Sequence, residues 1–176
     1  MPEPFLDHAT LLRLLHYDPE TGVFVWRRRG DVREQWNGRY AGKRAGYKWS
    51  PGGKIFYWVI RIFDWPFLAH RVAVLYMTGA WPENLVDHRD RDGLNNRWRN
   101  LRDADRAQNA VNAGVTRASS TGLRGAFLCR ETGRFRSQIK FEGRAIWLGY
   151  YETAEEAHAA YLVASRKYYG EFGGKP

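Results

Sequence analysis

The chain has 176 residues, of which 44% are hydrophobic and 15% aromatic, so it can bury a core and is not a disordered basic tail. No apolar run approaches the roughly 18 residues that a membrane-spanning helix needs. The single cysteine, Cys129, excludes a disulfide framework and the cysteine-based zinc fingers. Acidic residues stand near the start, where a secretory signal needs basic ones, so we expect a cytoplasmic protein that is not secreted.

Lysine and arginine number 28 against 19 aspartates and glutamates, which gives a net charge of +9. This excess favours a polyanionic partner, most simply nucleic acid, although an ordinary basic protein remains the alternative. The charge is +4 over residues 1–60, +1 over 61–113 and +3 over 122–176. We therefore expect polyanion contacts at both ends of the chain, around a central site that requires carboxylates.

The N-terminal third predicts a short helix, two strands and a second helix. Residues 7–16 have an apolar helical face, and a turn and a strand follow at 18–22 and 23–26. Residues 30–54 are rich in glycine and basic residues and predict loops, whereas 54–63 is aromatic and β-branched and predicts a strand. Residues 68–78 have helical spacing, with Gly79 as the expected C-cap.

The middle of the chain predicts a short strand at 85–87, a long polar loop and a helix capped by Asp105. Neighbouring residues on a strand point to opposite faces, so one of Asp87 and His88 can bind a metal while the other faces a different partner. Asn109 lies in the first turn of the helix and can face back toward the strand. A carboxylate and an amide oxygen suit a Mg²⁺-type cation, and a neutral imidazole can take a proton from water. That combination serves phosphodiester hydrolysis; the alternative is a solvated acidic loop with a surface histidine.

Residues 67–112 contain a series of short motifs in a fixed order: His70-Arg71, Trp81-Pro82, Val86-Asp87-His88, Asp92-Gly93, Asn95-Asn96-Arg97, Asn100-Leu101-Arg102 and Gln108-Asn109. By these motifs the segment resembles the HNH endonucleases of phages and mobile introns. The resemblance implies a ββα-metal finger around one divalent cation, Mg²⁺ with Mn²⁺ as a substitute. It implies that His88 is the general base, that Asp87 and Asn109 are the metal ligands, and that Asn100 braces the loop and orients the histidine. We expect His70 to pack or brace, with a phosphate contact as the alternative, and Arg102 to clamp a phosphate or to pair with a carboxylate.

The C-terminal block predicts three strands, at 123–129, 133–141 and 144–151, with a two-residue turn at Glu142-Gly143. This turn pairs Ile139 with Ile146, Gln138 with Trp147 and Arg136 with Gly149. One sheet face is then apolar, with Phe135, Ile139, Phe141, Ile146, Leu148 and Tyr150. The other face is basic, with Arg134, Arg136, Gln138, Lys140 and Trp147. A capping box from Thr153 to Glu156 begins a helix that can cover the apolar face, and the basic face can enter the DNA major groove or stay solvated.

Residues 122–176 contain a second series of motifs: Arg124-Gly125, Gly133-x-Phe135, Ile139, Trp147-Leu148-Gly149, Thr153-x-Glu155-Glu156-Ala157 and Ala160-Tyr161. By these motifs the segment resembles the DNA-binding domain of the plant APETALA-two/ethylene-response-factor (AP2) family. The resemblance implies DNA contacts by Arg124, Gly125, Gln138, Lys140 and Trp147. Phe127 and Cys129 stand where plant members carry arginines, so Arg134 and Arg136 are expected to supply the phosphate contacts.

Taken together, the sequence predicts an α+β protein with a basic N-terminal extension (1–66), an HNH ββα-metal finger (67–112), a linker (113–121) and a three-stranded sheet packed on one helix (122–176). The expected function is that of a hydrolase, a metal-dependent, homing-type endonuclease on double-stranded DNA. The alternatives are a sequence-specific DNA-binding regulator with a silent nuclease site and, because the basic sheet has one expected exposed aromatic, more weakly an RNA-binding protein. One finger cuts one strand, so cleavage of both strands requires a dimer or a second binding event.

Overall fold

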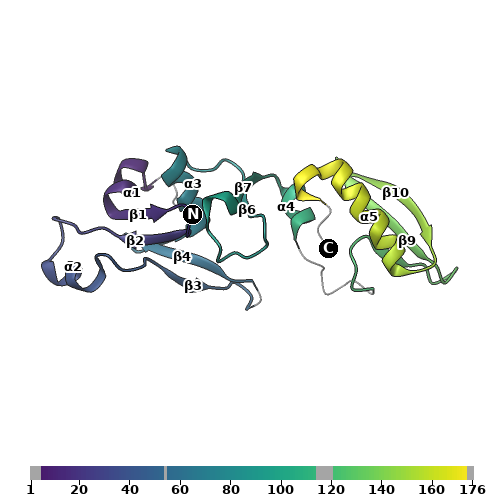
Figure 1. Ribbon diagram of the computed structural model, residues 1–176, viewed down its shortest axis with the longest axis horizontal. Coiled ribbons are helices and arrows are strands. Elements are labelled where there is room, and N and C mark those ends of the chain that lie inside the picture. Colours follow the sequence, from purple (N-terminus) through teal and green to yellow (C-terminus); the bar gives the residue numbers. More distant parts are fainter. Residues whose placement is uncertain (1–4, 54, 114–120, 174–176) are drawn as a thin grey trace. The chain divides into compact units, whose positions relative to one another are not determined.

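The computed structural model describes residues 5–53, 55–113 and 121–173. The chain divides into two compact units, Met1–Asp103 and Ala104–Pro176 (Figure 1). The expected N-terminal extension is not a unit of its own, because its strands share one core with the helix that follows them. Most of the expected linker, residues 114–120, lies outside the described residues. Within the described ranges, no helix is long and apolar enough to cross a membrane.

The first unit begins with a helix that ends earlier than its apolar spacing predicts. Helix α1 (His8–Leu14) is capped by Asp7, whose carboxylate accepts a hydrogen bond from the Thr10 amide at 2.6 Å. The chain then enters strand β1 (Leu15–Asp18), which pairs antiparallel with β2 (Val23–Trp26) across the expected turn. Strand β1 alternates buried and exposed residues, so its pairing with β2 prevails over a helical spacing that is equally compatible with the sequence.

The segment expected to be loop, residues 30–54, contains regular structure. Helix α2 (Glu34–Tyr40) and strand β3 (Tyr47–Trp49) lie in it. Strand β3 pairs with β4 (Tyr57–Ile62), which pairs with β5 (Trp65–Leu68), to give an antiparallel sheet. The predicted strand at 54–63 therefore corresponds to β4, and a second strand follows it directly.

Helix α3 (Ala69–Thr78) confirms the predicted helix, and Gly79 ends it with the left-handed φ of +82° that a C-cap glycine provides. Strand β6 (Leu85–His88), the 3₁₀ turn η2 (Trp98–Asn100) and strand β7 (Leu101–Ala104) complete the first unit, with β6 and β7 forming a two-stranded sheet. One apolar core joins the N-terminal strands to α3 and β7; its buried members are Leu6, Leu11, Leu14, Leu15, Tyr17, Phe24, Ala45, Ile60, Ile62, Phe67, Ala69, Val72, Ala73, Leu75 and Leu101.

The second unit contains the predicted sheet of three strands and a long helix, preceded by a short one. Asp105 and Thr153 cap the two helices as the sequence predicts; the capping box predicted at Thr153 forms, and Asp105 forms one as well, with Gln108. The strand order is β10-β9-β8, and the helix α5 packs on all three strands. The elements are α4 (Arg106–Asn112), β8 (Ala126–Leu128), β9 (Phe135–Phe141), β10 (Arg144–Tyr151), α5 (Ala154–Tyr169) and η3 (Gly170–Phe172).

A β-bulge in β10 corrects the predicted register and one of the predicted core residues. The pairs Ile139–Ile146 and Gln138–Trp147 form as expected, but a register shift between Trp147 and Gly149 places Gly149 opposite Ser137. Because of the extra residue, each later side chain of β10 lies on the face of the sheet opposite to the one that unbroken alternation predicts. Tyr150 therefore lies on the surface, 45% exposed, with its ring 4.9 Å from that of Trp147. The prediction of Tyr150 as a core residue was wrong.

Candidate active site

Asp87 and His88 lie at the end of β6, and both are buried, each with 6% of its surface exposed. The Asp87 carboxylate pairs with Arg102 of β7, whose Nε and Nη2 both lie 2.8 Å from Oδ2. Of the two roles that the sequence allows for Arg102, the structure therefore shows the ion pair. A charge this deeply buried needs such a partner, so Arg102 fixes the position of the carboxylate.

The Asp87 carboxylate is compatible with a divalent cation. A carboxylate offers two oxygen donors of the kind that Mg²⁺ and similar cations prefer, and the Nε and Nη2 contacts of Arg102 are made to Oδ2. The other expected ligand, Asn109, is half-buried on α4 in the second unit. The pairing of Asp87 with Asn109 thus remains a prediction. Among the described residues no cluster of three or more His, Cys, Asp or Glu side chains could hold a metal, but the expected donor set, one carboxylate and one amide, would not form such a cluster.

The ring of His88 is held by Asn96. Its Nε2 lies 3.2 Å from Asn96 Oδ1, and the Asn96 amide nitrogen donates to the Leu94 carbonyl at 3.3 Å, which supports this orientation of the amide. An oxygen opposite Nε2 favours the tautomer with hydrogen on Nε2 and the lone pair on Nδ1. Burial lowers the pKa of His88 below its ordinary value. The imidazole is therefore neutral at pH 7 and able to accept a proton.

A second histidine packs against His88. The ring of His70, from α3, stands at 89° to that of His88 with the centroids 4.9 Å apart, and Tyr57 of β4 lies against both rings. His70 is buried, and burial lowers its pKa to about 3. Its Nδ1 makes no hydrogen bond within the described part of the chain. The position fits the bracing role expected from the sequence, because a neutral ring fills the space beside His88.

Asn100 organises the loop between β6 and β7. Its amide nitrogen donates to Asp90 Oδ1 at 2.9 Å and to the Asn95 carbonyl at 2.7 Å, and its Oδ1 accepts from the Asp90 amide at 3.1 Å. The family resemblance gives Asn100 two roles. Its hydrogen bonds to Asp90 and Asn95 fit the bracing role, and Asn96 is a residue whose side-chain oxygen faces the His88 ring. Sequence reasoning placed Asn96 in a quoted motif without linking it to the histidine.

The N-terminal strands hold the same loop from outside. The hydroxyl of Tyr17 in β1 donates to the Asn96 carbonyl at 2.6 Å. Gly22, in the β1–β2 turn, lies so close that an added Cβ would be 2.4 Å from the backbone of Asn96. A Cβ added to Gly93, inside the loop, would likewise lie 2.4 Å from the Phe56 carbonyl oxygen. The extension thus buttresses the loop that carries the partner of His88.

In the second unit, two of the expected DNA contacts have internal roles. The Arg124 guanidinium donates to the carbonyls of Val111 and Ala110, the latter at 2.7 Å, at the end of α4. Gly125 lies under Tyr161, where a Cβ would be 2.1 Å from the ring. The remaining expected contacts lie on β9, β10 and the turn before β9: Arg134, Arg136, Lys140 and Trp147 are exposed, and Gln138 is half-buried.

The exposed sheet face is also richer in aromatic side chains than the sequence predicted. Tyr150 lies beside Trp147, and Phe127 of β8 is exposed with Arg136 5.7 Å from the centre of its ring. Arg134 pairs with Glu152 at 2.9 Å in an exposed ion pair, which contributes little to stability. The face therefore combines cations with three exposed rings.

Residues 67–111 match the family model described as HNH endonuclease. This segment is therefore similar to HNH endonuclease domains. The match includes Asp87, His88, Asn100 and Asn109, and it supports a nuclease that acts on DNA. Comparisons with curated proteins and with solved structures gave no significant match.

Proposed function

We propose that the protein is a metal-dependent endonuclease that hydrolyses phosphodiester bonds of double-stranded DNA, in the manner of homing endonucleases. The observation that carries the proposal is the arrangement at the end of β6. There, inside the HNH segment, a buried and neutral His88 has Nε2 held by Asn96, and it directly follows the Asp87 carboxylate.

In this proposal, each residue of the site has one role in the hydrolysis of the phosphodiester bond. His88 Nδ1 takes a proton from the water that attacks phosphorus, and Asn96 and His70 keep the ring in place. Asp87 and Asn109 would hold the cation, Mg²⁺ with Mn²⁺ as a substitute, since carboxylate and amide oxygens suit both. When bound, such a cation neutralises charge on the scissile phosphate and on the departing 3′ oxygen.

The β9–β10 face is the proposed DNA-holding surface of the second unit, as the AP2 resemblance implies. Arg134, Arg136 and Lys140 supply cations, and Trp147 supplies a ring for contacts in the groove. The sequence argument against RNA binding was that the sheet face has one expected exposed aromatic side chain, and the three exposed rings remove that argument. The match to the HNH family model favours DNA as the substrate. Arg136→Ala should weaken DNA binding and flatten its salt dependence by about one unit per lost phosphate contact.

A plasmid assay tests the activity. Purified protein with Mg²⁺ should nick or cut supercoiled DNA that carries its target, and EDTA should stop the reaction. His88→Ala should retain DNA binding and lose cleavage, whereas His16→Ala, at an exposed histidine on β1, should cleave at the wild-type rate. If His88→Ala cleaves as fast as the wild-type protein, His88 is not the base.

One observation favours the alternative of a DNA-binding regulator with a silent site. Arg102 already neutralises Asp87, so a cation must share the carboxylate with a guanidinium. DNA binding without cleavage in either Mg²⁺ or Mn²⁺ would support the regulator, and metal-dependent cleavage that His88→Ala abolishes would exclude it.

A further inference from the structure

The first unit contains a pocket that the proposed chemistry does not use. It has a volume of about 530 Å³, and its walls come from α1, β2, α2, β3, β4 and the β4–β5 turn. Its aromatic side chains include Trp26, Trp36 and Tyr40. The ring of Trp36 lies 5.6 Å from Trp26 at 81° and 5.1 Å from Tyr40 at 43°. The pocket is therefore bordered by inclined rings, a setting that suits a planar ligand.

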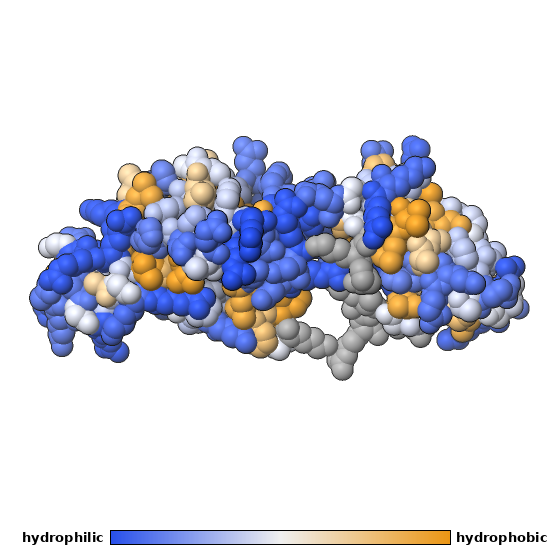
Figure 2. Space-filling view, viewed as in Figure 1, coloured by the Kyte–Doolittle hydropathy of each residue, from blue (hydrophilic) through white to orange (hydrophobic). Residues whose placement is uncertain are grey.

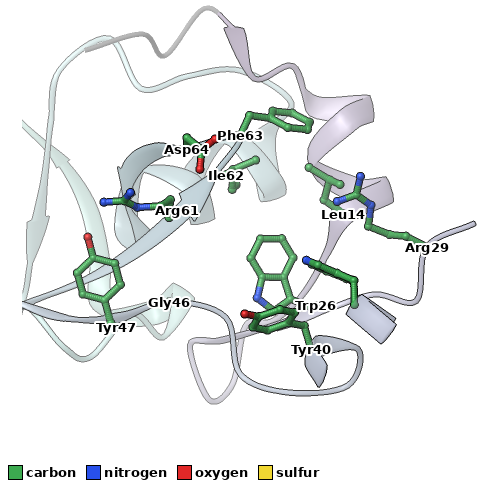
Figure 3. A pocket seen from close by; sticks show the side chains of 11 residues that line it. Leu14, Trp26, Arg29, Tyr40, Gly46, Tyr47, Arg61, Ile62, Phe63 and Asp64 are labelled. Carbon is green, nitrogen blue, oxygen red and sulfur yellow. The ribbon is translucent and has the colours of Figure 1, made fainter. Parts of the chain in front are cut away.

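The surroundings of the pocket are strongly basic. Residues 27–61 contain ten lysines and arginines and two acidic residues, so this stretch holds +8 of the chain's net charge of +9. Figure 2 shows mostly hydrophilic residues over α2 and the segments next to it. Arg29 and Arg61 line the pocket itself, and Figure 3 shows them on opposite sides of it. Charge of this sign and density calls for a polyanionic partner, not an apolar peptide.

The β4–β5 turn places an exposed apolar ring at the edge of the pocket. Phe63 and Asp64 both have positive φ, 48° and 65°, and Phe63 is 54% exposed. Aspartate tolerates this conformation, whereas a bulky residue rarely adopts it. A strained turn that presents a phenylalanine to solvent beside a cavity is typical of a functional contact. Proteins that bend DNA insert such side chains between base pairs.

We propose that this pocket takes one unstacked nucleobase of the bound DNA. The base stacks on the rings of Trp36 and Tyr40, and Phe63 fills the space that it leaves in the duplex. Arg29 and Arg61 attract the flanking phosphates, and the Asp64 carboxylate can accept a hydrogen bond from an exocyclic amine. The inference rests on the proposed function, because it takes DNA to be the ligand.

The rings are held in place before any ligand binds. Arg29 is fixed by Asp31, with its Nε and Nη2 at 3.0 and 2.7 Å from the carboxylate oxygens, and its guanidinium lies 5.3 Å from the centre of the Trp36 ring. Arg39 lies 5.4 Å from the centre of the Tyr40 ring. Preformed stacking surfaces reduce the entropy that binding must overcome.

A pair of duplexes that differ in one base tests the proposal without knowledge of the target sequence. Both carry a single bulged nucleotide in the same backbone, but in one of them the bulged position is abasic. The wild-type protein should bind the duplex with the base about tenfold tighter, since stacking of one base on aromatic side chains has roughly this effect. Trp36→Ala and Phe63→Ala should each reduce this ratio toward one.

Trp49→Ala is the matched control, because Trp49 is 43% exposed on β3 and does not line the pocket. This variant should keep the wild-type ratio. Phe63→Ala removes an exposed side chain, so it tests the pocket even if Trp36→Ala fails to fold. Equal wild-type affinity for the two bulged duplexes would overturn the inference. Metal-dependent plasmid cleavage would then still stand, whereas loss of all DNA binding and cleavage would defeat the proposed function as well.

Discussion

The acid stability of the first unit is expected to depend on His70. In the folded protein burial lowers the pKa of His70 to about 3, whereas in an unfolded chain the pKa is about 6.5. A depressed folded-state pKa means that the neutral ring contributes fully to stability above about pH 6.5. That contribution is lost progressively as the pH falls toward 3, because the unfolded chain takes up the proton first.

The magnitude follows from the difference between the two pKa values. Each pH unit between them changes the free energy of unfolding by about 1.4 kcal/mol, so His70 should reduce it by about 3 kcal/mol between about pH 7.5 and about pH 4.5. His70→Phe keeps a ring beside Tyr57 and His88 and removes the titration. Its free energy of unfolding should therefore fall by about 3 kcal/mol less than that of the wild-type protein over the same interval.

Urea denaturation followed by tryptophan fluorescence measures the effect in the correct unit, because seven of the eight tryptophans precede residue 104. The pKa of His88 is also lowered, but His88 is present in both proteins, so its contribution cancels in the comparison. His16→Phe, at an exposed position on β1, should lose as much stability in acid as the wild-type protein. The reasoning is refuted if His70→Phe is as acid-sensitive as the wild-type protein.

Two substitutions test the residues around the proposed base and metal ligand. Arg102→Met removes the guanidinium from the buried Asp87 carboxylate and should reduce the free energy of unfolding by about 3–5 kcal/mol at pH 7; an unchanged urea midpoint would contradict this. Asn96→Ala removes the oxygen that faces His88 Nε2, so single-turnover cleavage should slow by about 10- to 100-fold while DNA affinity stays constant. Wild-type cleavage by this variant would show that Asn96 does not position the ring.

The parts of the fold that local rules determine could be predicted from the sequence. The N-cap at Asp105, the capping box at Thr153 and the C-cap at Gly79 each depend on residues within one helical turn, and all three form. Strand β1 was missed because its residues also fit a helical spacing, and helix α2 was missed because it lies in a glycine-rich, basic segment that is typical of loops. The bulge near Gly149 was missed because alternation alone assumes an unbroken ladder; the glycine, with φ +130°, was the available signal.

In the candidate site, too, the features set by neighbouring residues could be predicted from the sequence and those set by the closure of loops could not. Asp87 and His88 could be found because they are adjacent in a recognisable motif. The contact of Asn96 with His88 and the ion pair of Asp87 with Arg102 depend on how the β6–β7 loop closes, which spacing does not specify. The Tyr17 hydrogen bond to the Asn96 carbonyl spans 79 residues, so no local pattern could have indicated it.

The hydrogen bond from Tyr17 to Asn96 indicates whether the HNH segment can form its site without the residues that precede it. The β6–β7 loop, residues 89–97, contributes no side chain to the apolar core. Besides the hydrogen bonds of Asn100, it has contacts with Tyr17, Gly22 and Phe56, all of them N-terminal to the HNH segment. Removal of residues 1–66 would take away these contacts together with the ring of Tyr57, which lies against both histidines. A buried imidazole would then become exposed to water, and its Asn96 contact would lose its support.

We therefore expect a fragment of residues 67–176 to lose metal-dependent cleavage, even though it retains every residue of the HNH match. Its second unit should still fold, because that unit has its own core around Ile139, Tyr161 and Ala164. DNA binding by the exposed sheet face separates loss of the site from loss of the whole protein. Cleavage by this fragment at the wild-type rate would mean that the N-terminal strands do not support the loop. A fragment that binds DNA without cutting it would show that the catalytic geometry depends on contacts made by residues 1–66.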